Sequence, residues 1–333
     1  MAQKRGTRPG PGQRQLPAGG WVVRGGGLLL RVVGMIAVVA GLARFRAAGA
    51  NSITGYGPPL WQSLLIGGLL FILGTVAVFG GGRLSRLGRR HTARIIQRPE
   101  ELADRSYVLY LRPFYEDRKL YEIRRPSASR RYAQYGSPVS RTWEELLVTT
   151  FRRYGRVVAV GQPGERLPLP GAERFYLPLD DWQSVVSDLI RRARLVVLVA
   201  GDGPGTLWEL TETVRLLPPE QLVLPVYDDE DGYERFRASV PQAFADRVEQ
   251  LGADARPAPA FPKYPADHRP GIRVVGGMRG IVHFDPDWTP RFVRFDLSAV
   301  RARTAAGRAR KAGRLQVAPL LTRIEQRLPP RGA

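Results

Sequence analysis

Two long apolar stretches dominate the first quarter of the chain. Residues 25–43 read GGGLLLRVVGMIAVVAGLA, in which Arg31 is the one charged residue, and residues 64–82 read LLIGGLLFILGTVAVFGGG with no charge. A bilayer core about 30 Å thick requires roughly 20 apolar residues in a helix. The second stretch meets that length, and Trp61 precedes it at a position typical of an interfacial aromatic residue. The pattern predicts a two-helix transmembrane hairpin over residues 25–82, with helices at about 25–43 and 62–82.

The first apolar stretch has a second interpretation, a cleaved signal peptide, because a basic leader precedes it. Against cleavage, the leader is long, and Arg44 and Arg46 follow the stretch where a small-residue cleavage site would be expected. Arg31 lies close enough to the start of the stretch for its side chain to extend toward the membrane surface. Two transmembrane helices are therefore favoured over one cleaved signal.

Basic residues on both sides of the hairpin predict its orientation. The connecting stretch holds Arg44 and Arg46 and then the uncharged NSITGYGPPL, whereas both outer flanks are strongly basic. The flanking residues are Lys4, Arg5, Arg8, Arg14 and Arg24 before the first helix, and Arg83, Arg86, Arg89, Arg90 and Arg94 after the second. The positive-inside rule then puts both termini in the cytoplasm, which predicts a two-pass protein of the inner or plasma membrane. Anionic lipid headgroups are the expected partners of these arginines.

The flanks and the helices themselves indicate an anchor. Residues 1–24 are predicted to form a disordered basic tail, and residues 83–105 a basic juxtamembrane linker. The helices hold no paired intramembrane charges of the kind that mark an ion pathway, which argues against a transporter. The spacing of Gly34 with Gly41, and of Gly67 with Gly74, would let the two helices approach closely.

From residue 106 onward, strand-like and helix-like segments alternate. The predicted strands are residues 107–114, 156–161, 195–201 and 221–229, and the predicted helices are residues 142–155, 181–193, 205–217 and 233–251. Residues 162–179 and 252–270 are predicted to be loops, and residues 280–284 and 291–297 either a last strand or a small hairpin. This alternation predicts an α/β domain over residues 106–300, with a doubly wound, mostly parallel, flavodoxin-like sheet. Residues 301–333 are predicted to be a basic tail with a short amphipathic helix.

Composition excludes several kinds of chemistry. The chain has 333 residues and no cysteine, which rules out disulfides, thiolate metal sites and a cysteine nucleophile. Its three histidines are far apart in the sequence, so no metal site is predicted. The net charge of +21 raises the question of nucleic-acid binding. Much of that charge lies in the tails and beside the membrane, and no nucleic-acid-reading motif is present, so nucleic acid is not an expected partner.

The loops after the predicted strands are where a ligand site is expected, because open parallel sheets bind ligands beyond the carboxyl ends of their strands. The third strand ends in Gly201-Asp202-Gly203-Pro204-Gly205, directly before a helix. Such a turn can present backbone N–H groups to a phosphate, although a plain structural turn is the favoured interpretation. The other candidate binding residues at strand ends are Arg112, Phe114, Gly161, Gly164 and Glu165.

The helix after the glycine-rich turn carries the candidate acids. Trp208 and Glu212 are four residues apart and therefore share one face, with Glu209 on the adjoining edge. A glutamate beside an aromatic residue can act as a general acid or base, or can bind ribose hydroxyls. The alternative is that both acids offset the helix dipole while the tryptophan packs. For Arg112, an ion pair with Glu116 or Asp117 is favoured over a substrate contact.

The order of these segments resembles the Toll/interleukin-1 receptor (TIR) domain superfamily over about residues 106–229. The segments that carry the likeness are YVLYLRPFYED, RVVAVGQPGERLPLPG, LIRRARLVVLVAG, GPGTLWELTE and LVLPVY. In enzymatic members the glutamate of a W-x-x-x-E motif cleaves the nicotinamide–ribose bond of NAD, and Glu212 matches it by its spacing from Trp208. The stretch from Pro163-Gly164 to Pro170-Gly171 would match the loop that flanks the nucleotide pocket.

The resemblance implies two functions, because many members of this superfamily are non-enzymatic assembly modules. The first is a membrane-anchored cytoplasmic signalling module that binds a nucleotide, a TIR-type partner or a second copy of itself. The alternative is an NAD hydrolase with Glu212 and Glu209 as the candidate catalytic residues. NAD is then the implied substrate or ligand, and the residues themselves point to no other cofactor. A basic insertion, residues 115–141, separates the first strand from the first helix.

Overall fold

The structure is a computed structural model in which residues 15–54, 56–96, 98–112, 143–161, 168, 171–176, 182–266, 278–296, 298–302, 307 and 311–330 are described. The chain divides into two compact units, one ending at Ala93 and the other beginning at Arg94. Each unit has its own pattern of packing.

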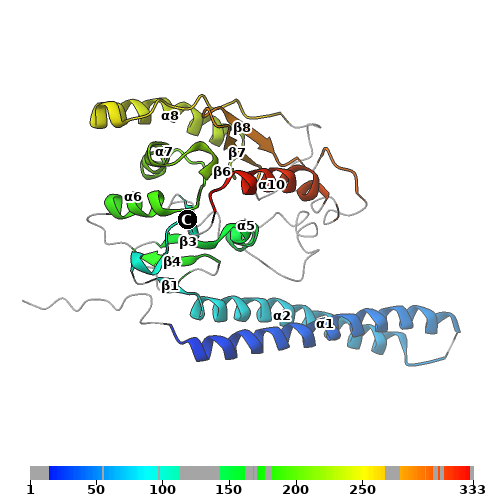
Figure 1. Cartoon of the computed structure of the whole chain (residues 1–333). Coiled ribbons are helices and arrows are strands. Elements are labelled where there is room, and N and C mark those ends of the chain that lie inside the picture. The colour runs from blue at the N-terminus through cyan, green and yellow to red at the C-terminus, as the bar shows by residue number, and fades with distance from the viewer. Residues whose placement is uncertain are drawn as a thin grey trace, which may run out of the picture. The chain divides into compact units, whose positions relative to one another are not determined.

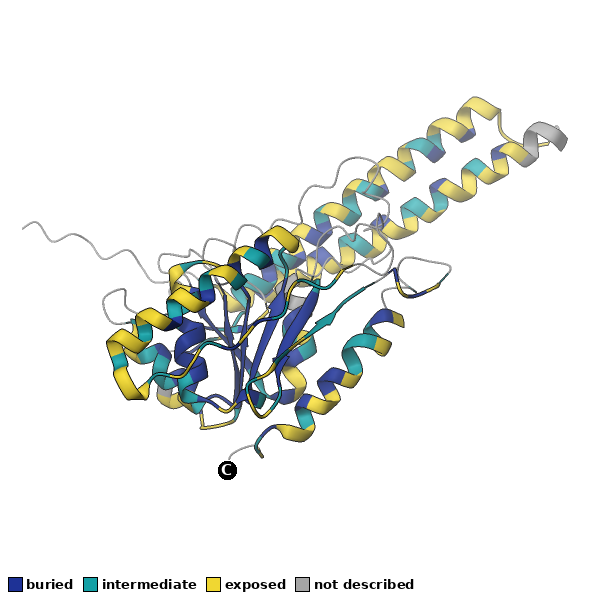
Figure 2. Ribbon diagram, turned by 90° about the horizontal axis from the view of Figure 1, so that it is seen from above, coloured by how far each residue is buried: buried dark blue, intermediate teal, exposed yellow. Residues whose placement is uncertain are grey.

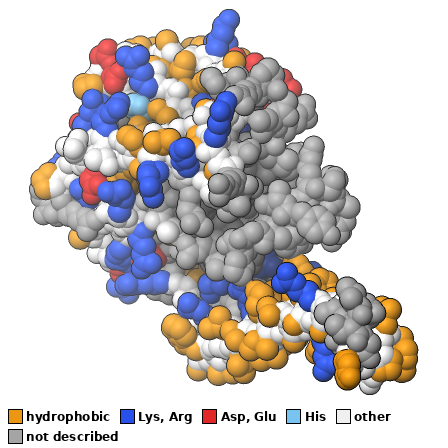
Figure 3. Space-filling view, turned by 90° about the vertical axis from the view of Figure 1, so that its right-hand side faces the viewer, with side chains coloured by type: hydrophobic (Ala, Val, Ile, Leu, Met, Phe, Trp, Pro, Cys, Tyr) orange, Lys and Arg blue, Asp and Glu red, His pale blue; other side chains and the backbone are white. Residues whose placement is uncertain are grey.

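The first unit is a pair of long helices, α1 (Pro17–Thr54) and α2 (Leu60–His91). Both are long and apolar enough to cross a membrane, which confirms the prediction of two long apolar helices. Their large side chains point mostly outward: apolar residues cover much of the hairpin surface seen in Figure 3. α2 continues as one helix to His91, beyond the end of its apolar stretch.

Glycines form the contact between α1 and α2. They recur every seven residues on each helix, as Gly20, Gly27, Gly34 and Gly41 on α1 and as Gly67, Gly74, Gly81 and Gly88 on α2. A Cβ atom added to Gly34 would lie 2.7 Å from the carbonyl oxygen of Gly74, and one added to Gly74 would lie 2.6 Å from that of Gly34. No larger residue fits there, so the close approach expected at Gly34, Gly41, Gly67 and Gly74 is confirmed. A strict seven-residue repeat favours a left-handed supercoil.

The second unit is built on one eight-stranded sheet with the strand order β1-β4-β3-β2-β5-β6-β7-β8. The strands are β1 (Ile95–Ile96), β2 (Tyr107–Leu111), β3 (Arg156–Gly161), β4 (Glu173–Tyr176), β5 (Leu195–Leu198), β6 (Leu222–Val226), β7 (Gly280–Phe284) and β8 (Pro290–Arg294). Strands β1 to β6 pair in parallel, and β7 and β8 add an antiparallel hairpin. The predicted α/β class with a mostly parallel sheet is confirmed, and the last two strands form the hairpin alternative.

Helices cover both faces of this sheet (Figure 1). One face carries α6 (Trp182–Arg192), α7 (Pro204–Leu216) and α8 (Glu230–Leu251), and the other carries α5 (Trp143–Phe151) and α10 (Ala318–Arg327). Short helical turns complete the unit: η2 (Pro99–Glu101), η5 (Arg152–Tyr154), η6 (Pro219–Gln221), η7 (Gly252–Asp254) and the π-helical η8 (Gly313–Val317).

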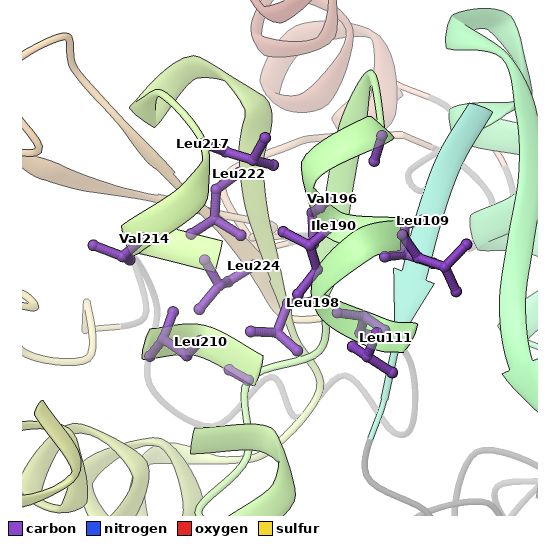
Figure 4. Close-up of a cluster of buried hydrophobic side chains, with 14 of the residues drawn as sticks. Leu109, Leu111, Ile190, Val196, Leu198, Leu210, Val214, Leu217, Leu222 and Leu224 are labelled. Atoms are coloured by element: carbon purple, nitrogen blue, oxygen red, sulfur yellow. The ribbon is translucent and has the colours of Figure 1, made fainter. Parts of the chain in front are cut away.

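Alternating side chains on each strand build two separate cores, because successive residues of a strand point to opposite faces. On the α6–α7–α8 face, Leu198 and Leu224 of the sheet meet Leu210 of α7, as Figure 4 shows. On the other face, Tyr110 and Val197 pack with residues of α5 and α10. Most strands are buried, in contrast with the largely exposed hairpin helices, whereas the edge strand β8 is only partly buried (Figure 2).

Strand β4 lies inside the stretch predicted to be a loop, residues 162–179, so that prediction is wrong for residues 173–176. The strand escaped detection because two of its four residues are charged. Glu173 accepts hydrogen bonds from Arg156 at 2.6 and 3.2 Å, and Arg174 is fully buried. Partners from neighbouring strands thus make a polar segment into an inner strand.

Two further elements lie in regions expected to be linker or tail. β1 falls within residues 83–105 and pairs with β4 through Ile95 and Ile96. α10 falls within residues 301–333, where a short amphipathic helix was predicted, and it buries Leu320, Leu321 and Ile324 in the second core. Both segments are therefore parts of the folded domain.

Candidate functional site

The carboxyl edge of the parallel strands is the first place to look for a ligand site. β2 lies between β3 and β5, so the chain continues to one side of β2 and later resumes on the other. In open α/β sheets this reversal leaves room for a ligand beyond the strand ends. The residues that follow β2 and β5 here are Arg112 and the turn Gly201-Asp202-Gly203.

The turn after β5 leads directly into α7. Gly203 is the residue before the helix and Pro204 occupies its first turn, where a missing N–H group costs nothing. The first turn of α7 holds no acidic residue and receives no side-chain cap. Asp202 forms an ion pair with Arg235 of α8 at 3.3 Å, so the one acid in this turn has a cationic partner. This geometry is compatible with both earlier interpretations, a structural turn and a phosphate-binding turn.

Glu212 lies at the centre of a hydrogen-bond network. Its carboxylate accepts hydrogen bonds from Ser187 of α6 at 2.6 Å, from Arg215 of α7 at 2.6 and 3.0 Å, and from Arg247 of α8 at 2.6 Å. The residue is only 2% exposed. Burial raises the pKa of Glu212, but the hydrogen bonds from Arg215, Ser187 and Arg247 outweigh it and lower the pKa to about 2. Glu212 is therefore an ionised group that joins three helices.

Trp208 belongs to the same network. Its ring packs edge-on against Trp182 of α6, with centroids 4.8 Å apart, and Arg247 lies over it at 5.7 Å. Because Arg247 contacts both Trp208 and Glu212, these two residues share a helix face, as their spacing predicts. The Trp208 ring is therefore packed between protein side chains on both of these sides.

Glu209 has the opposite environment. It is 8% exposed, and its carboxylate makes no hydrogen bond or ion pair within the described part of the chain. It shares the sheet-facing stripe of α7 with Thr206 and Thr213, which are 3% and 0% exposed. Burial raises the pKa of Glu209 to about 8, so the carboxyl group is mostly protonated at neutral pH. Of the two candidate acids, Glu209 is the one whose carboxyl group has no partner among the described residues, and it lies nearer the start of α7.

The structure does not bring Arg112 together with the α7 residues. The Arg112 guanidinium lies over the ring of Tyr110 at 5.8 Å, and Tyr110 belongs to the core beneath α5 and α10. Glu209, Glu212 and Trp208 lie on the opposite face of the sheet. Phe114, Gly164 and Glu165, and the expected partners Glu116 and Asp117, lie outside the described residues.

Gly161, at the end of β3, has a packing role. A Cβ atom there would lie 2.4 Å from the ring of Tyr176, at the end of the neighbouring strand β4. The aromatic ring thus covers the glycine at the carboxyl edge. Tyr176 was not singled out from the sequence, because it ends a strand that was predicted to be a loop.

Three partners of Glu212 also escaped sequence reasoning. Arg215 was detectable, since it is three residues from Glu212 on the same helix. Ser187 and Arg247 lie 25 and 35 residues away, on other helices, and nothing in their local sequence marks them. Only the packing of α6, α7 and α8 brings them to the carboxylate.

Among the described residues, no metal cluster marks the carboxyl edge. Within the described ranges, no group of three or more histidine, aspartate or glutamate residues is placed to hold a metal ion. A small pocket lies instead near the start of β6, at the amino edge of the sheet. Its lining is Pro219, Glu220, Leu222, His283, Phe284, Leu320, Arg323, Ile324 and Arg327, none of which was predicted as a site residue.

Comparisons with known proteins add no assignment. No protein-family model, no curated protein and no solved structure matches this chain. The class that the fold defines is therefore an α/β domain with a mostly parallel sheet, preceded by two long apolar helices.

Proposed function

We propose that this protein is a membrane-anchored TIR-like signalling module whose carboxyl sheet edge binds a nucleotide or a partner domain in the cytoplasm. The observation that carries the nucleotide site is the buried carboxyl group of Glu209, which has no partner among the described residues and lies near the glycine-rich start of α7. The TIR assignment rests on the sequence segments described above. The partner is then a second copy of this chain or another TIR-type domain.

The membrane anchor is supported by the surface of the hairpin. Only 17% of the most apolar window of each helix is buried, whereas a core helix of a water-soluble protein is mostly buried. An apolar surface of that extent is unfavourable in water and favourable in lipid. The distribution of basic residues favours a two-pass arrangement in the inner or plasma membrane, with both termini in the cytoplasm.

Nucleotide binding is supported by two complementary groups on α7. A protonated carboxyl group such as Glu209 can donate a hydrogen bond to a ribose hydroxyl or a carbonyl oxygen. The start of the helix offers N–H groups and a partial positive charge to a phosphate. Together they fit a ligand that carries both a sugar and a phosphate.

An NAD hydrolase is the second candidate function, and the geometry favours a different acid for it. The sequence resemblance assigns the catalytic role to Glu212, whose carboxylate already accepts hydrogen bonds from two arginines and a serine. Glu209 is unpaired within the part of the chain that the structure describes, and burial raises its pKa to about 8, which suits a group that transfers or shares a proton. We therefore assign any hydrolase activity to Glu209.

The test uses the full-length chain in detergent or nanodiscs with a panel of NAD, ATP and their nucleosides. We expect at least one nucleotide to raise the melting temperature of the wild-type protein, and Glu209→Gln to abolish that shift. The matched control is Glu249→Gln, because Glu249 is exposed on α8. Chromatography of NAD and nicotinamide then separates the two functions: stabilisation without turnover supports a binding module, and turnover lost in Glu209→Gln supports the hydrolase.

Absence of any nucleotide effect in the wild-type protein would contradict the nucleotide site and leave partner binding. Loss of the effect in both glutamate variants would contradict the assignment to Glu209. A self-association measurement on the same samples, by light scattering, tests whether the partner is a second copy.

A further inference from the structure

The residues beside the α1–α2 glycine contact change from apolar to basic or polar along the hairpin. On α1, the contact glycines are Gly20, Gly27, Gly34 and Gly41, and the residue four positions after each of them lies against a glycine of α2. From the connecting loop toward the chain terminus these pairs are Phe45 with Gly67, Val38 with Gly74, Arg31 with Gly81 and Arg24 with Gly88. The residue at this position is thus apolar in the half near the loop, where Cβ of Arg44 also lies against Gly67, and basic in the other half.

On α2, the residues beside the glycine contact change from apolar to polar at the same height along the hairpin. Phe71 and Val78 lie against α1 glycines in the half near the loop, and Ser85 and Thr92 do so in the other half. From Leu60 to Phe79 the apolar part of α2 is about 30 Å long, which matches the hydrocarbon core of a bilayer. The level of Gly81 then corresponds to the headgroup region of one leaflet.

Arg31 lies at this boundary. A Cβ atom at Gly81 would lie 2.7 Å from Cγ of Arg31, so the missing side chain of Gly81 leaves the space that the arginine stem occupies. Gly81 packs against Gly27, one turn before Arg31 on α1. Helical side chains normally lean toward the start of their helix, which for Arg31 is the direction of the basic flank of α1.

The guanidinium of Arg31 has no counter-charge within the described hairpin. It makes no hydrogen bond or ion pair there, and the residue is half-buried. A cation at the edge of the hydrocarbon region is costly without a partner. Arg24 lies two turns further along the same flank, over the ring of Trp21 at 5.2 Å, and Trp21 is 61% exposed.

We propose that Arg31, together with Arg24, binds the phosphate of an anionic phospholipid in the cytoplasmic leaflet. A guanidinium presents paired N–H donors that match a phosphate, and its weak hydration suits it to the interface. Trp21 lies at the depth where aromatic rings prefer to be in a membrane. This inference rests on the membrane anchor proposed above, and it assigns a lipid-binding role to a residue that otherwise only weakens the apolar stretch.

The experiment reconstitutes the full-length protein in vesicles of phosphatidylcholine with added phosphatidylglycerol and measures which lipids stay bound after purification. Four forms are compared: wild type, Arg31→Leu, Arg31→Lys and Arg46→Leu. Arg46 is exposed near the other end of α1, so its replacement removes the same charge far from the proposed site. We expect Arg31→Leu to lower the enrichment of phosphatidylglycerol about fivefold, the equivalent of about 1 kcal/mol for one arginine at the surface.

The remaining arms separate the alternatives. Arg31→Lys should keep part of the enrichment, and Arg46→Leu should keep all of it. Inorganic phosphate in excess should not displace the lipid, because the site is proposed to hold a headgroup and not a free anion. Equal enrichment in wild type and Arg31→Leu, with both inserted, would overturn the lipid site alone. A wild-type protein that stays in the aqueous fraction would overturn the membrane anchor as well.

Discussion

Two groups of helices in this chain pack by opposite means. In the α1–α2 hairpin, glycines every seven residues bring backbone against backbone, and the large side chains point outward. In the α6–α7–α8 layer, large and charged side chains fill the space between helices, with Trp208 against Trp182 and Glu212 bound to both Ser187 and Arg247. The same chain thus uses the smallest residue in one region and some of the largest in the other.

The difference follows from the solvent that each region is expected to meet. Helices in lipid gain nothing by burying apolar side chains against each other, so close backbone contact through small residues is what holds them together. Helices over a sheet in water gain by burying apolar area, and a buried charge is tolerated only with partners. Mutations in the hairpin should therefore act by disturbing close backbone packing, and mutations in the α6–α7–α8 layer by disturbing apolar burial and the pairing of buried charges.

The largest effect is expected from Glu212→Ala in the α6–α7–α8 layer. Removing the carboxylate leaves Arg215 and Arg247 facing each other at a largely buried position, which should destabilise the domain by about 3–5 kcal/mol. Denaturant unfolding of the full chain in detergent, followed by tryptophan fluorescence, measures this loss. A loss below about 1 kcal/mol would mean that the network contributes little.

The same network predicts the behaviour in acid. The pKa of Glu212 is lowered to about 2 in the folded state. The contribution of Glu212 to the free energy of unfolding is therefore complete when the pH is above the ordinary pKa near 4.5, and it is lost as the pH falls from 4.5 toward 2. The Glu212→Ala protein should therefore show a flatter stability profile over that range than wild type.

A smaller effect, confined to the hairpin, is expected from Gly74→Leu. The new side chain meets the Gly34 carbonyl oxygen and the Val38 backbone, so the helices must separate at a cost of about 1–3 kcal/mol. Gly68→Leu is the matched control, since a Cβ atom at Gly68 has no atom within 4 Å.

Cross-linking measures the change in the hairpin. The chain has no cysteine of its own, and a Cβ atom at Gly80 would lie 3.9 Å from Cδ2 of Leu30, so cysteines at those two positions are close enough for a short bifunctional thiol reagent to join them. The rate should fall in Gly74→Leu and stay unchanged in Gly68→Leu. Equal rates in both would show that the glycine contact is not what holds the hairpin.

The smallest effect is expected from Glu209→Gln, which should stabilise the protein, whereas the two substitutions above should destabilise it. Since burial raises the pKa of Glu209 to about 8, wild-type stability should fall as pH rises from about 4.5 to 8, while the unfolded state ionises and the folded state does not. The amide removes this slope and should stabilise the protein by about 1–2 kcal/mol at neutral pH, after the cost of burying its own polar group. Melting temperatures measured across pH 5–8 check this; a slope equal to that of wild type would contradict it.

Much of the fold was predictable, because hydrophobic patterning reports burial. Residues 157–160 and 195–200 are apolar runs and α6 has a regular amphipathic pattern, so both strands and the helix were predicted, although the strand predicted over residues 195–201 ends at Leu198. β4 was missed because two of its four residues are charged: the partner of Glu173 is Arg156 on another strand, and local sequence carries no record of that pairing. β1, with two residues, is too short to have a pattern.

The candidate site was predictable in part. The spacing of Trp208 and Glu212 correctly put them on one face, and the distance of Glu209 from them correctly put it on another edge. Their environments were not predictable, since the arginines that hold Glu212 come from residues 215 and 247. Likewise, whether Arg112 faces α7 depends on the pleat of β2, which local sequence does not reveal.

The two outer margins of the sheet limit how copies of this protein can associate. One margin is β1, only two residues long, and the other is β8, which starts at Pro290 and carries Arg291 and Arg294. Short strands, proline and charged side chains all discourage another chain from extending a sheet by hydrogen bonding. Self-association of this domain would accordingly use its helices and loops, leaving the sheet closed to edge-to-edge aggregation.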